Sequence, residues 1–231
     1  MNVKLILLLP LWVLLASELP AAVLVQWTFE SSAPTTAGPH AAETGTGTVS
    51  GSHVSDITTY SSPTGNGSAS SFASNRWAEG DYYQFTFSTL GVGNLSLSFD
   101  QGSSATGPGS FEIFYSVGGA FVSTGITYSV YEYTSPVTAH SFGAWSESSA
   151  RSEYHYDFDL GSLDALENQT LVHLRLQMLG TSTPSGGSVA NVGVTRIDNV
   201  TIHYFTTVPE PAAMLLGVVA FGPLLLHRRR S

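Results

Sequence analysis

The chain has 231 residues, of which only 11% are charged, and it contains 12 Phe, 10 Tyr and 4 Trp but no cysteine. Without cysteine there is no disulfide bond, thiolate zinc site or cysteine nucleophile. The aromatic residues supply enough apolar surface for a folded core, which excludes a disordered chain. Between positions 23 and 207 there are 15 acidic residues, 4 arginines and no lysine, a net charge of −11. Such a surface repels phosphate backbones, so we exclude nucleic acid as a partner.

The first 22 residues have the three-part layout of a secretory signal peptide. Lys4 supplies a positive charge, Leu5–Leu15 is apolar, and small residues follow. The apolar run is too short for a stable membrane anchor, and Glu18 interrupts its continuation. We therefore predict export by the Sec machinery and cleavage after Ala21 or Ala22. A retained N-terminal anchor is the alternative.

Rows of alternating apolar and polar residues run through the chain from Val23 to Thr207. A period of two with one polar face is typical of antiparallel strands that pack on a core from one side. The rows are Val23–Phe29, Tyr82–Phe87, Leu95–Phe99, Phe111–Val117, Tyr154–Leu160, Val172–Met178 and Arg196–Tyr204. A single sheet would leave apolar residues exposed, so the rows predict one all-β domain of about eight to eleven strands, an antiparallel β-sandwich.

Three segments fit this pattern less well. Ser31–Asn75 is rich in Ser, Thr and Gly, which predicts long loops with one or two strands, Val54–Tyr60 being the best candidate. Leu163–Asn168 is predicted to form one helical turn. In the last row Val200 shares its parity with Asp198, although Ile197 on the other parity is also apolar. Either both faces are covered there or a β-bulge shifts the register near Asp198 and Asn199.

The C-terminus combines a short motif, an apolar segment and a basic cluster. These elements are Val208, Pro209, Glu210 and Pro211, then fifteen uncharged residues from Ala212 to Leu226, then Arg228, Arg229 and Arg230. Fifteen helical residues rise about 22 Å, which is short of the roughly 30 Å hydrocarbon core. The arginines keep this end in the cytoplasm and leave the body of the protein outside.

This order of elements resembles the PEP-CTERM sorting signal of Gram-negative bacteria. The resemblance implies that an exosortase, a membrane-embedded transpeptidase-like protease, recognises Pro209, Glu210 and Pro211 and removes the tail. The chain is then held at the inner membrane only transiently, in a host that secretes exopolysaccharide. The expected organisation is a signal peptide (1–22), a β-sandwich (23–207) and a sorting signal with a single transmembrane helix (208–231). A permanent anchor after a stiff Pro-Glu-Pro linker is the alternative.

The order of the rows also resembles jelly-roll sandwiches of the carbohydrate-binding and concanavalin-like kind. The resemblance depends on Trp27–Glu30, Leu95–Asp100, Tyr154–Leu160 followed by Gly161, and Arg196–Ile202. In such modules the first and last strands are often neighbours that bind structural calcium, which makes Glu30 with Asp198 a candidate hard-oxygen metal site. The other interpretations of Asp198 are a salt bridge, a carboxylate satisfied by backbone N–H groups, and simple exposure.

Two further groups of residues are candidates for ligand binding. Glu153, His155, Asp157 and Asp159 fall on one side of a strand, either as a solvated face or as a ladder for cations. Several aromatic residues are not needed for one core row and either stack on sugar rings or pack under loops or in the core. These are Trp77, Tyr82, Phe114, Tyr128, Tyr131, Tyr133 and Trp145.

For catalysis the sequence offers no Gly-x-Ser-x-Gly elbow, phosphate loop or metalloprotease helix. We therefore predict a non-enzymatic protein of the cell surface or extracellular matrix, with a structural role or a role in contacting extracellular polysaccharide. Apart from calcium, no cofactor is expected. The alternative is a polysaccharide-active enzyme of the jelly-roll type, a hydrolase or lyase, because catalytic carboxylate pairs have no fixed sequence spacing.

Overall fold

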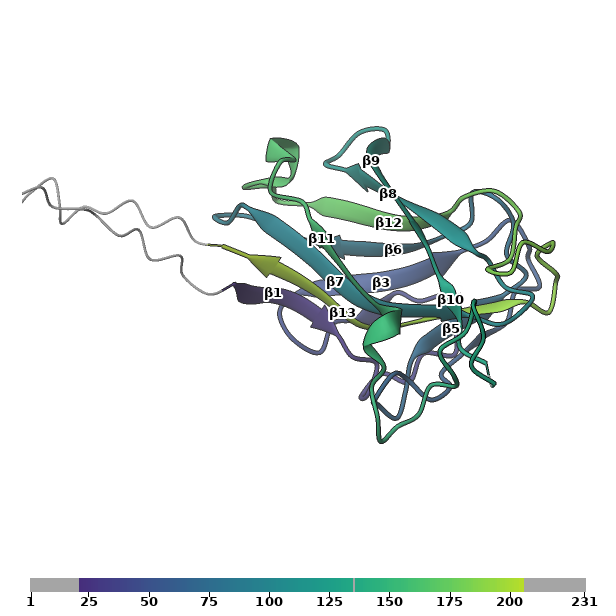
Figure 1. Ribbon diagram of the computed structural model, residues 1–231. Coiled ribbons are helices and arrows are strands. Elements are labelled where there is room, and N and C mark those ends of the chain that lie inside the picture. Colours follow the sequence, from purple (N-terminus) through teal and green to yellow (C-terminus); the bar gives the residue numbers. More distant parts are fainter. Residues whose placement is uncertain (1–20, 135, 206–231) are drawn as a thin grey trace, which may run out of the picture.

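The computed structural model describes residues 21–134 and 136–205. Residues 1–20 of the predicted signal peptide and the whole predicted sorting signal therefore lie outside the described residues. Within the described ranges a pair of β-sheets packs face to face as a β-sandwich, and the helical segments are two 3₁₀ turns (Figure 1). None of the helices in these ranges is long and apolar enough to cross a membrane.

The two sheets contain seven and six strands. The first consists of β1 (Ala22–Trp27), β4 (Tyr60–Ser61), β5 (Phe72–Asn75), β7 (Leu95–Ser103), β10 (Tyr131–Glu132), β11 (His155–Asp159) and β13 (Val194–Tyr204). The second consists of β2 (His40–Ala41), β3 (Gly47–Ser52), β6 (Tyr82–Phe87), β8 (Ser110–Ser116), β9 (Val122–Ser129) and β12 (Val172–Met178). The 3₁₀ turns are η1 (Ser152–Tyr154) and η2 (Asp164–Leu166).

Strand β13 organises the seven-stranded sheet, because it pairs with β7 along one edge and with β1 and β5 along the other. Ala22 of β1 lies opposite Tyr204 of β13, so both ends of the described chain lie at the same end of the sandwich (Figure 1). The six-stranded sheet has the order β2-β3-β6-β12-β8-β9, and all its pairs are antiparallel. The short pair β10 and β7 is parallel and departs from the predicted antiparallel pattern.

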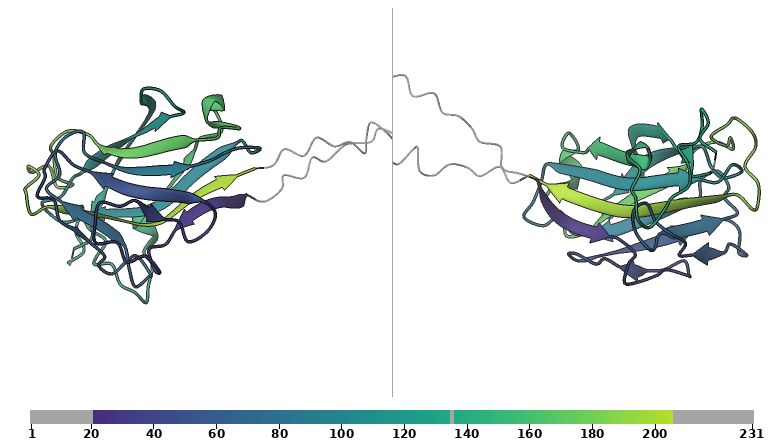
Figure 2. Two further views of the ribbon diagram at one scale, coloured as in Figure 1. Left: turned by 180° about the vertical axis from the view of Figure 1, so that it is seen from behind. Right: turned by 60° about the horizontal axis from the view of Figure 1, so that its bottom comes forward.

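Aromatic residues join the two sheets. Trp27 of β1 meets Phe85 of β6 edge to face, with their ring centroids 5.2 Å apart. Along one side of the sandwich, Tyr156 and Phe158 of β11 pack against Tyr128 of β9. Figure 2 shows the two layers from two further sides. The predicted aromatic-rich core is therefore confirmed, and fully burying one such side chain stabilises the fold by about 1.5–3 kcal/mol.

Most predicted rows are confirmed as strands with one buried face. In β12 the alternation is complete, with Val172, Leu174, Leu176 and Met178 buried and the residues between them half-buried. The predicted turn between positions 163 and 168 is η2. Val23 is 42% exposed despite its parity, because the register shifts between Val23 and Val25.

The prediction for positions 31–75 was wrong in number and place. Val54 and its neighbours form turns, Val54 itself is 84% exposed, and only Tyr60 belongs to a strand. The segment contains four strands, β2 to β5. Strand β3 escaped prediction because large side chains of other strands fill the space above its glycines. A Cβ on Gly47 would lie 2.9 Å from the Trp27 ring, and one on Gly51 would lie 2.5 Å from the Tyr60 ring.

Candidate functional site

The outer side of the six-stranded sheet carries polar and aromatic side chains in register. Gln84 of β6 lies opposite Arg175 of β12, which lies opposite Phe114 of β8. Residues that lie opposite each other in antiparallel strands project from the same face of a sheet. All three are half-buried, whereas their sequence neighbours in β6 and β12 are buried in the core. We call this surface the open face; it is formed by Tyr82, Gln84, Thr86, Glu112, Phe114, Phe121, His173, Arg175 and Gln177.

Arg175 lies at the centre of the open face between two aromatic rings. Its guanidinium carbon is 3.8 Å from the centroid of the Tyr82 ring and 3.3 Å from that of Phe121. Its Nε donates a hydrogen bond of 2.9 Å to Oε1 of Gln84. A cation over an aromatic ring at a partly exposed position is stabilised by about 0.5–1 kcal/mol. These contacts hold the guanidinium in one place and orientation.

His173 extends the polar region of the open face. Its Nδ1 lies 2.9 Å from the hydroxyl of Thr86 and 3.4 Å from Nε2 of Gln84. Burial lowers the pKa of His173, and the charge of Arg175 lowers it further. The imidazole is therefore neutral at neutral pH and can accept or donate a hydrogen bond to a ligand.

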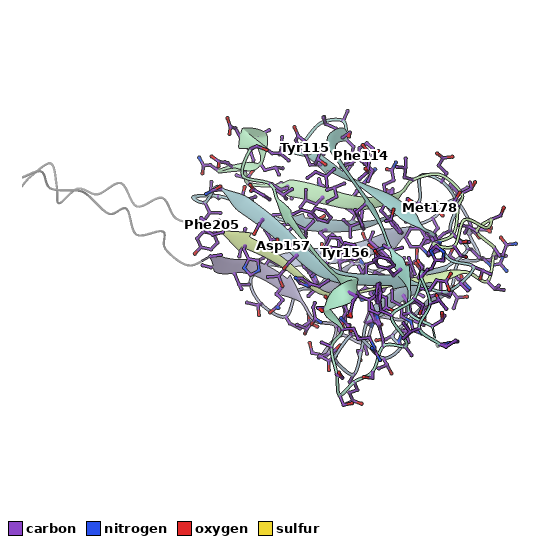
Figure 3. The ribbon with its side chains drawn as sticks, in the orientation of Figure 1. Phe114, Tyr115, Tyr156, Asp157, Met178 and Phe205 are labelled. Carbon is purple, nitrogen blue, oxygen red and sulfur yellow. The ribbon has the colours of Figure 1, made fainter. Side chains whose placement is uncertain are left out.

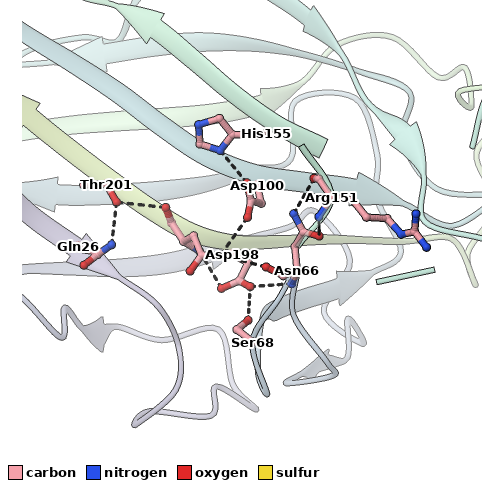
Figure 4. Close-up of polar contacts among 9 residues, drawn as sticks. Gln26, Asn66, Ser68, Asp100, Arg151, His155, Asp198 and Thr201 are labelled. Carbon is pink, nitrogen blue, oxygen red and sulfur yellow. Dashed lines mark hydrogen bonds and ion pairs between the residues drawn. The ribbon is translucent and has the colours of Figure 1, made fainter. Parts of the chain in front are cut away.

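The outer side of the seven-stranded sheet is different, because loops cover some of it. We call this surface the covered face; its centre is the buried carboxylate of Asp198 (Figure 4). One oxygen of Asp198 accepts hydrogen bonds from the backbone N–H of Asn66 (2.9 Å) and the hydroxyl of Ser68, and the other accepts from the N–H of Asn199 (2.7 Å). Burial raises the pKa of Asp198 to about 7, while these hydrogen bonds oppose the rise.

Glu30 binds the loop that also surrounds Asp198. Its carboxylate accepts hydrogen bonds from the N–H groups of Ala69 (3.2 Å) and Ser70 (2.8 Å). The two predicted metal ligands are thus brought to the loop at positions 65–70. Across the described ranges, no three residues among His, Cys, Asp and Glu are grouped so that they could hold a metal ion. A calcium site here would therefore need backbone carbonyl oxygens beside the two carboxylates, and it stays a prediction.

The sequence left several interpretations of Asp198 open, and the structure separates most of them. Simple exposure is wrong, because Asp198 is fully buried. A carboxylate satisfied by backbone N–H groups is confirmed. The predicted bulge is also confirmed, because the β13–β7 register shifts after Asp198 and Asn199 has a positive φ of 51°. The bulge lets Asn199 donate a hydrogen bond of 2.9 Å from its side chain to Asp100.

Asn66 joins two loops of the covered face, which the sequence did not predict. Its side chain donates a 3.0 Å hydrogen bond to the carbonyl of Arg151 and accepts one of 2.8 Å from the N–H of the same residue. The N–H of Gly67 bonds to the carbonyl of Ser146 at 2.9 Å. Asp198 thereby fixes the loop at 65–70, which in turn fixes the loop at 143–151. A local sequence pattern does not predict a contact between residues that are 85 positions apart.

The acidic row on β11 is a solvated face, as one of the two interpretations predicted. Glu153, His155, Asp157 and Asp159 are all exposed. The side chain of His155 contacts the covered face, where its Nδ1 lies 2.8 Å from Oδ1 of Asp100. Asp157 and Tyr156, both labelled in Figure 3, belong to opposite faces of β11, with Asp157 exposed and Tyr156 half-buried.

The candidate sugar-stacking residues divide between the core and the surface. Trp77 and Tyr128 are buried in the core, and Trp145 is buried against Tyr133 and Tyr154, so the prediction of packing under loops or in the core is right for all three. Tyr131 belongs to β10 of the other sheet, and Tyr133 lies over Arg196 on the covered face. Only Tyr82 and Phe114 of the candidates belong to the open face; Phe114 is labelled in Figure 3. Phe121 was missed because it lies in the turn between β8 and β9, where no alternation marks it.

One hydrogen-bonded chain has the residue types of a serine nucleophile, its base and an orienting acid. His53 lies 3.0 Å from Asp81 through Nδ1 and 3.1 Å from the hydroxyl of Ser74 through Nε2. Ser74 is 1% exposed, and the Trp77 ring packs 4.4 Å from the imidazole, centroid to centroid. A nucleophile needs access to its substrate, so this buried chain does not favour the enzyme alternative. Asp81 instead accepts the N–H groups of Val54 and Ala78 and stabilises the adjoining loops.

The fold and the open face define a class: an all-β sandwich of two sheets with an exposed aromatic and polar surface on one of them. No protein-family model matches the sequence, and no curated protein matches it. Solved structures with a similar course of the chain include the K1 cleaved adhesin domain of Lys-gingipain from Porphyromonas gingivalis, at 10% identity over 77% of this chain and 96% of that one, with a TM-score of 0.43.

Two others carry carbohydrate-binding names. TmCBM61 in complex with β-1,4-galactotriose is 11% identical over 76% of this chain and 92% of that one, with a TM-score of 0.38. The CBM22-1–CBM22-2 tandem domain of Paenibacillus barcinonensis Xyn10C is 13% identical over 86% of this chain and 50% of that one, with a TM-score of 0.42. These likenesses are too distant to identify a ligand or an activity.

Proposed function

We propose that this chain is an exported, non-catalytic protein of the cell surface or extracellular matrix, and that its β-sandwich, of the jelly-roll kind, binds a polysaccharide through the open face. The observation that carries the proposal is the aromatic and amide surface around Arg175. Tyr82 and Phe121 contact the guanidinium, and the side chain of Gln84 in β6 accepts a hydrogen bond from it. The combination provides both stacking surfaces and directional hydrogen bonds.

The chemistry of a sugar ring fits such a surface. The C–H face of a pyranose packs on an aromatic ring, and its hydroxyl groups need donors and acceptors at the rim. Phe114 supplies apolar area, while Gln84, Gln177 and His173 supply hydrogen-bonding groups along two adjacent strands. Neighbouring positions on one face of a strand are about 6.6 Å apart, so an extended glycan can contact several of them.

Sorting by an exosortase is the second element of the proposal, and it is supported by the sequence from Val208 to Ser231. In this account Sec exports the chain, the C-terminal segment holds it at the inner membrane of a Gram-negative bacterium, and the exosortase cleaves near Pro209, Glu210 and Pro211. Mass spectrometry of the exported protein tests it. A mature protein that lacks both terminal segments is expected. An exported form that retains the peptide from His227 to Ser231 would contradict processing.

A structural calcium ion at Glu30 and Asp198 is the third element. The residues fit in one respect: two hard carboxylates reach the same loop, whose Ser70 carbonyl lies 3.1 Å from the Ser68 hydroxyl that binds Asp198. Calcium takes six to eight oxygen ligands and accepts backbone carbonyls among them. Bound there, it would neutralise the buried charge of Asp198. The test is thermal unfolding of the full chain with calcium and with a chelator, and an unchanged Tm would contradict the site.

Glycan binding is tested with the purified full chain on a glycan array, followed by titration of the best ligand. Tyr82→Ala should weaken binding by up to about tenfold, since packing on an aromatic ring is worth about 0.5–1.5 kcal/mol and Tyr82 also positions Arg175. Tyr131→Ala is the matched control, because Tyr131 is 38% exposed but belongs to the other sheet. Equal losses in both variants, or no binding of any glycan, would overturn the proposal.

A further inference from the structure

We propose that the polysaccharide bound by the open face is anionic, and that Arg175 receives its carboxylate or sulfate group. This inference rests on the proposed glycan-binding function and names the chemical class of the ligand. It depends on three observations: the geometry of the guanidinium, the groups that surround it, and the distribution of charge over the molecule.

The guanidinium of Arg175 is held in position, but its hydrogen-bonding capacity is not fully used. Nε is used by Gln84, whereas neither terminal nitrogen forms a hydrogen bond or ion pair with another residue in the described portion of the chain. The rings of Tyr82 and Phe121 pack against the guanidinium, with their centroids 3.8 Å and 3.3 Å from its carbon atom. Its remaining edge is therefore the one that forms paired hydrogen bonds to the two oxygens of a carboxylate or sulfate.

The surroundings of Arg175 lack the counter-ion that its charge would ordinarily find. Glu112 is the single acidic residue among the positions of the open face, and its carboxylate accepts a hydrogen bond from the hydroxyl of Ser123. Burial lowers the pKa of Arg175, which shows that its charge is partly desolvated. A partly desolvated cation that forms no ion pair with a neighbouring acid is stabilised by an anion brought by a ligand.

The charge of the whole chain makes this local arrangement informative. Fifteen acids and four arginines between positions 23 and 207 repel a polyanion in general. The acidic side chains of β11 belong to the other sheet, as do Asp100 and Asp198. An acidic polysaccharide would therefore bind only where the face is close to neutral and a positive charge is fixed. The open face is such a place.

A neutral polysaccharide explains the surface less completely. Neutral sugars would use the aromatic rings and the amides, but they leave the two terminal nitrogens of Arg175 without a charged acceptor. One anionic group per binding position satisfies them and leaves Gln177, Thr86 and His173 for hydroxyl groups. The shared chemistry of uronate and sulfate is a planar or tetrahedral anion with several acceptor oxygens, and the experiment separates the two.

The test uses the purified full chain and four probes: polygalacturonate, its methyl ester, a sulfated galactan and the same galactan without sulfate. We expect wild-type protein to bind polygalacturonate or the sulfated galactan at least about tenfold more tightly than its uncharged counterpart. Arg175→Gln should abolish that preference, so that the variant binds each anionic probe no more tightly than its uncharged counterpart. Arg175→Lys should retain some of that preference, because lysine keeps the positive charge but lacks the two parallel N–H donors of a guanidinium.

Arg76→Gln is the matched control. Arg76 follows β5 of the other sheet and is not part of the open face, so this substitution removes the same charge outside the proposed binding surface. Equal loss in Arg175→Gln and Arg76→Gln, or equal affinity of wild-type protein for charged and uncharged probes, would overturn the anionic ligand and leave glycan binding intact. No binding of any probe or array glycan overturns both proposals. Should Arg175→Gln fail to fold, the affinities of the wild-type protein for each anionic probe and its uncharged form decide whether the ligand is anionic.

Discussion

The two outer faces of the sandwich are built from strands of the same kind, yet one is covered and the other is open. On the covered face, loops at 65–70 and 143–151 are fixed over the sheet by Glu30, Asp198 and Asn66. On the open face, the polar groups of Gln84, His173 and Arg175 bond mainly to one another. Buried polar groups on the first face hold the chain in place, whereas half-buried polar groups on the second remain available to a ligand.

The difference follows from where the carboxylates lie. A buried carboxylate needs hydrogen-bond donors, and here backbone N–H groups, one of them from a loop, supply them. The loop is therefore held in place, because opening it would leave the carboxylate without that donor. The guanidinium of Arg175, in contrast, is held by two aromatic rings and one amide, and its terminal nitrogens form no hydrogen bond with another of the described residues. Substitutions should therefore reduce stability on the covered face and ligand affinity on the open face.

The largest effect is expected from Asp198→Ala. This change leaves two buried backbone donors without their acceptor, the N–H groups of Asn66 and Asn199, and leaves the Ser68 hydroxyl with the Ser70 carbonyl alone. Each buried orphan costs about 1–3 kcal/mol, and partial relaxation of the loop leads us to expect a total loss of about 3–5 kcal/mol. Chemical denaturation of the full chain measures it. Asp157→Ala on the exposed side of β11 is the control and should change the free energy of unfolding by less than about 0.5 kcal/mol.

The second expectation concerns pH. In the metal-free protein the pKa of Asp198 is about 7, against an ordinary value of 3.8, so folding favours its protonated form. Its contribution to stability is complete below about pH 4 and is lost as pH rises through about 7. The difference in pKa corresponds to about 4 kcal/mol, and loop opening that admits water should reduce the observed change to about 2 kcal/mol.

The measurement is the free energy of unfolding between pH 4 and 8 with a chelator present, for wild type and Asp198→Asn. The difference between the two curves isolates this carboxyl group from all others, and it should narrow as pH rises. A constant difference would show that Asp198 does not titrate in this range. With calcium added, an occupied site would bind the ionised carboxylate and reverse the slope, because the ion stabilises the charged form.

Several strands and the bulge could be predicted from the alternation of apolar and polar residues, whereas the packing of the loops could not. The strands β6, β7 and β12 follow from their hydrophobic period, and the bulge at Asp198 follows from two apolar parities meeting in one strand. A carboxylate of Asp198 satisfied by backbone N–H groups was one of several open interpretations, and the loop that supplies the N–H group of Asn66 was not predicted. Strand β3 was missed because glycines leave room for Trp27 and Tyr60, so its own side chains carry no pattern.

The sites depend on contacts between distant segments of the chain, which no local pattern encodes. Tyr82 and Phe114 could be listed from the sequence but not separated from the buried Trp77 and Tyr128. Phe121 reaches Arg175 only because a turn folds back over the sheet. Covered and open faces have the same alternation, and what distinguishes them is where the loops pack.

A smaller effect is expected from Asn66→Ala, which separates the two loops of the covered face. The change removes both hydrogen bonds to the backbone of Arg151 and leaves the backbone N–H of residue 66 on Asp198. We expect a loss of about 1–2 kcal/mol and faster hydrogen exchange at positions 143–151, because their link to the loop at 65–70 is broken. Exchange measured by mass spectrometry reports the second effect. Uniformly faster exchange over the whole chain would mean global destabilisation rather than release of one loop.

The smallest change in stability is expected on the open face. Arg175→Gln removes two cation–π contacts and one hydrogen bond to Gln84, each of modest strength at a half-buried position. The freed rings of Tyr82 and Phe121 can pack against the shorter side chain, so we expect the free energy of unfolding to fall by less than about 1 kcal/mol. Denaturation beside the binding titrations measures both properties in one sample. A loss as large as that of Asp198→Ala would mean that Arg175 serves the fold, and the distinction between a stabilising face and a binding face would fail.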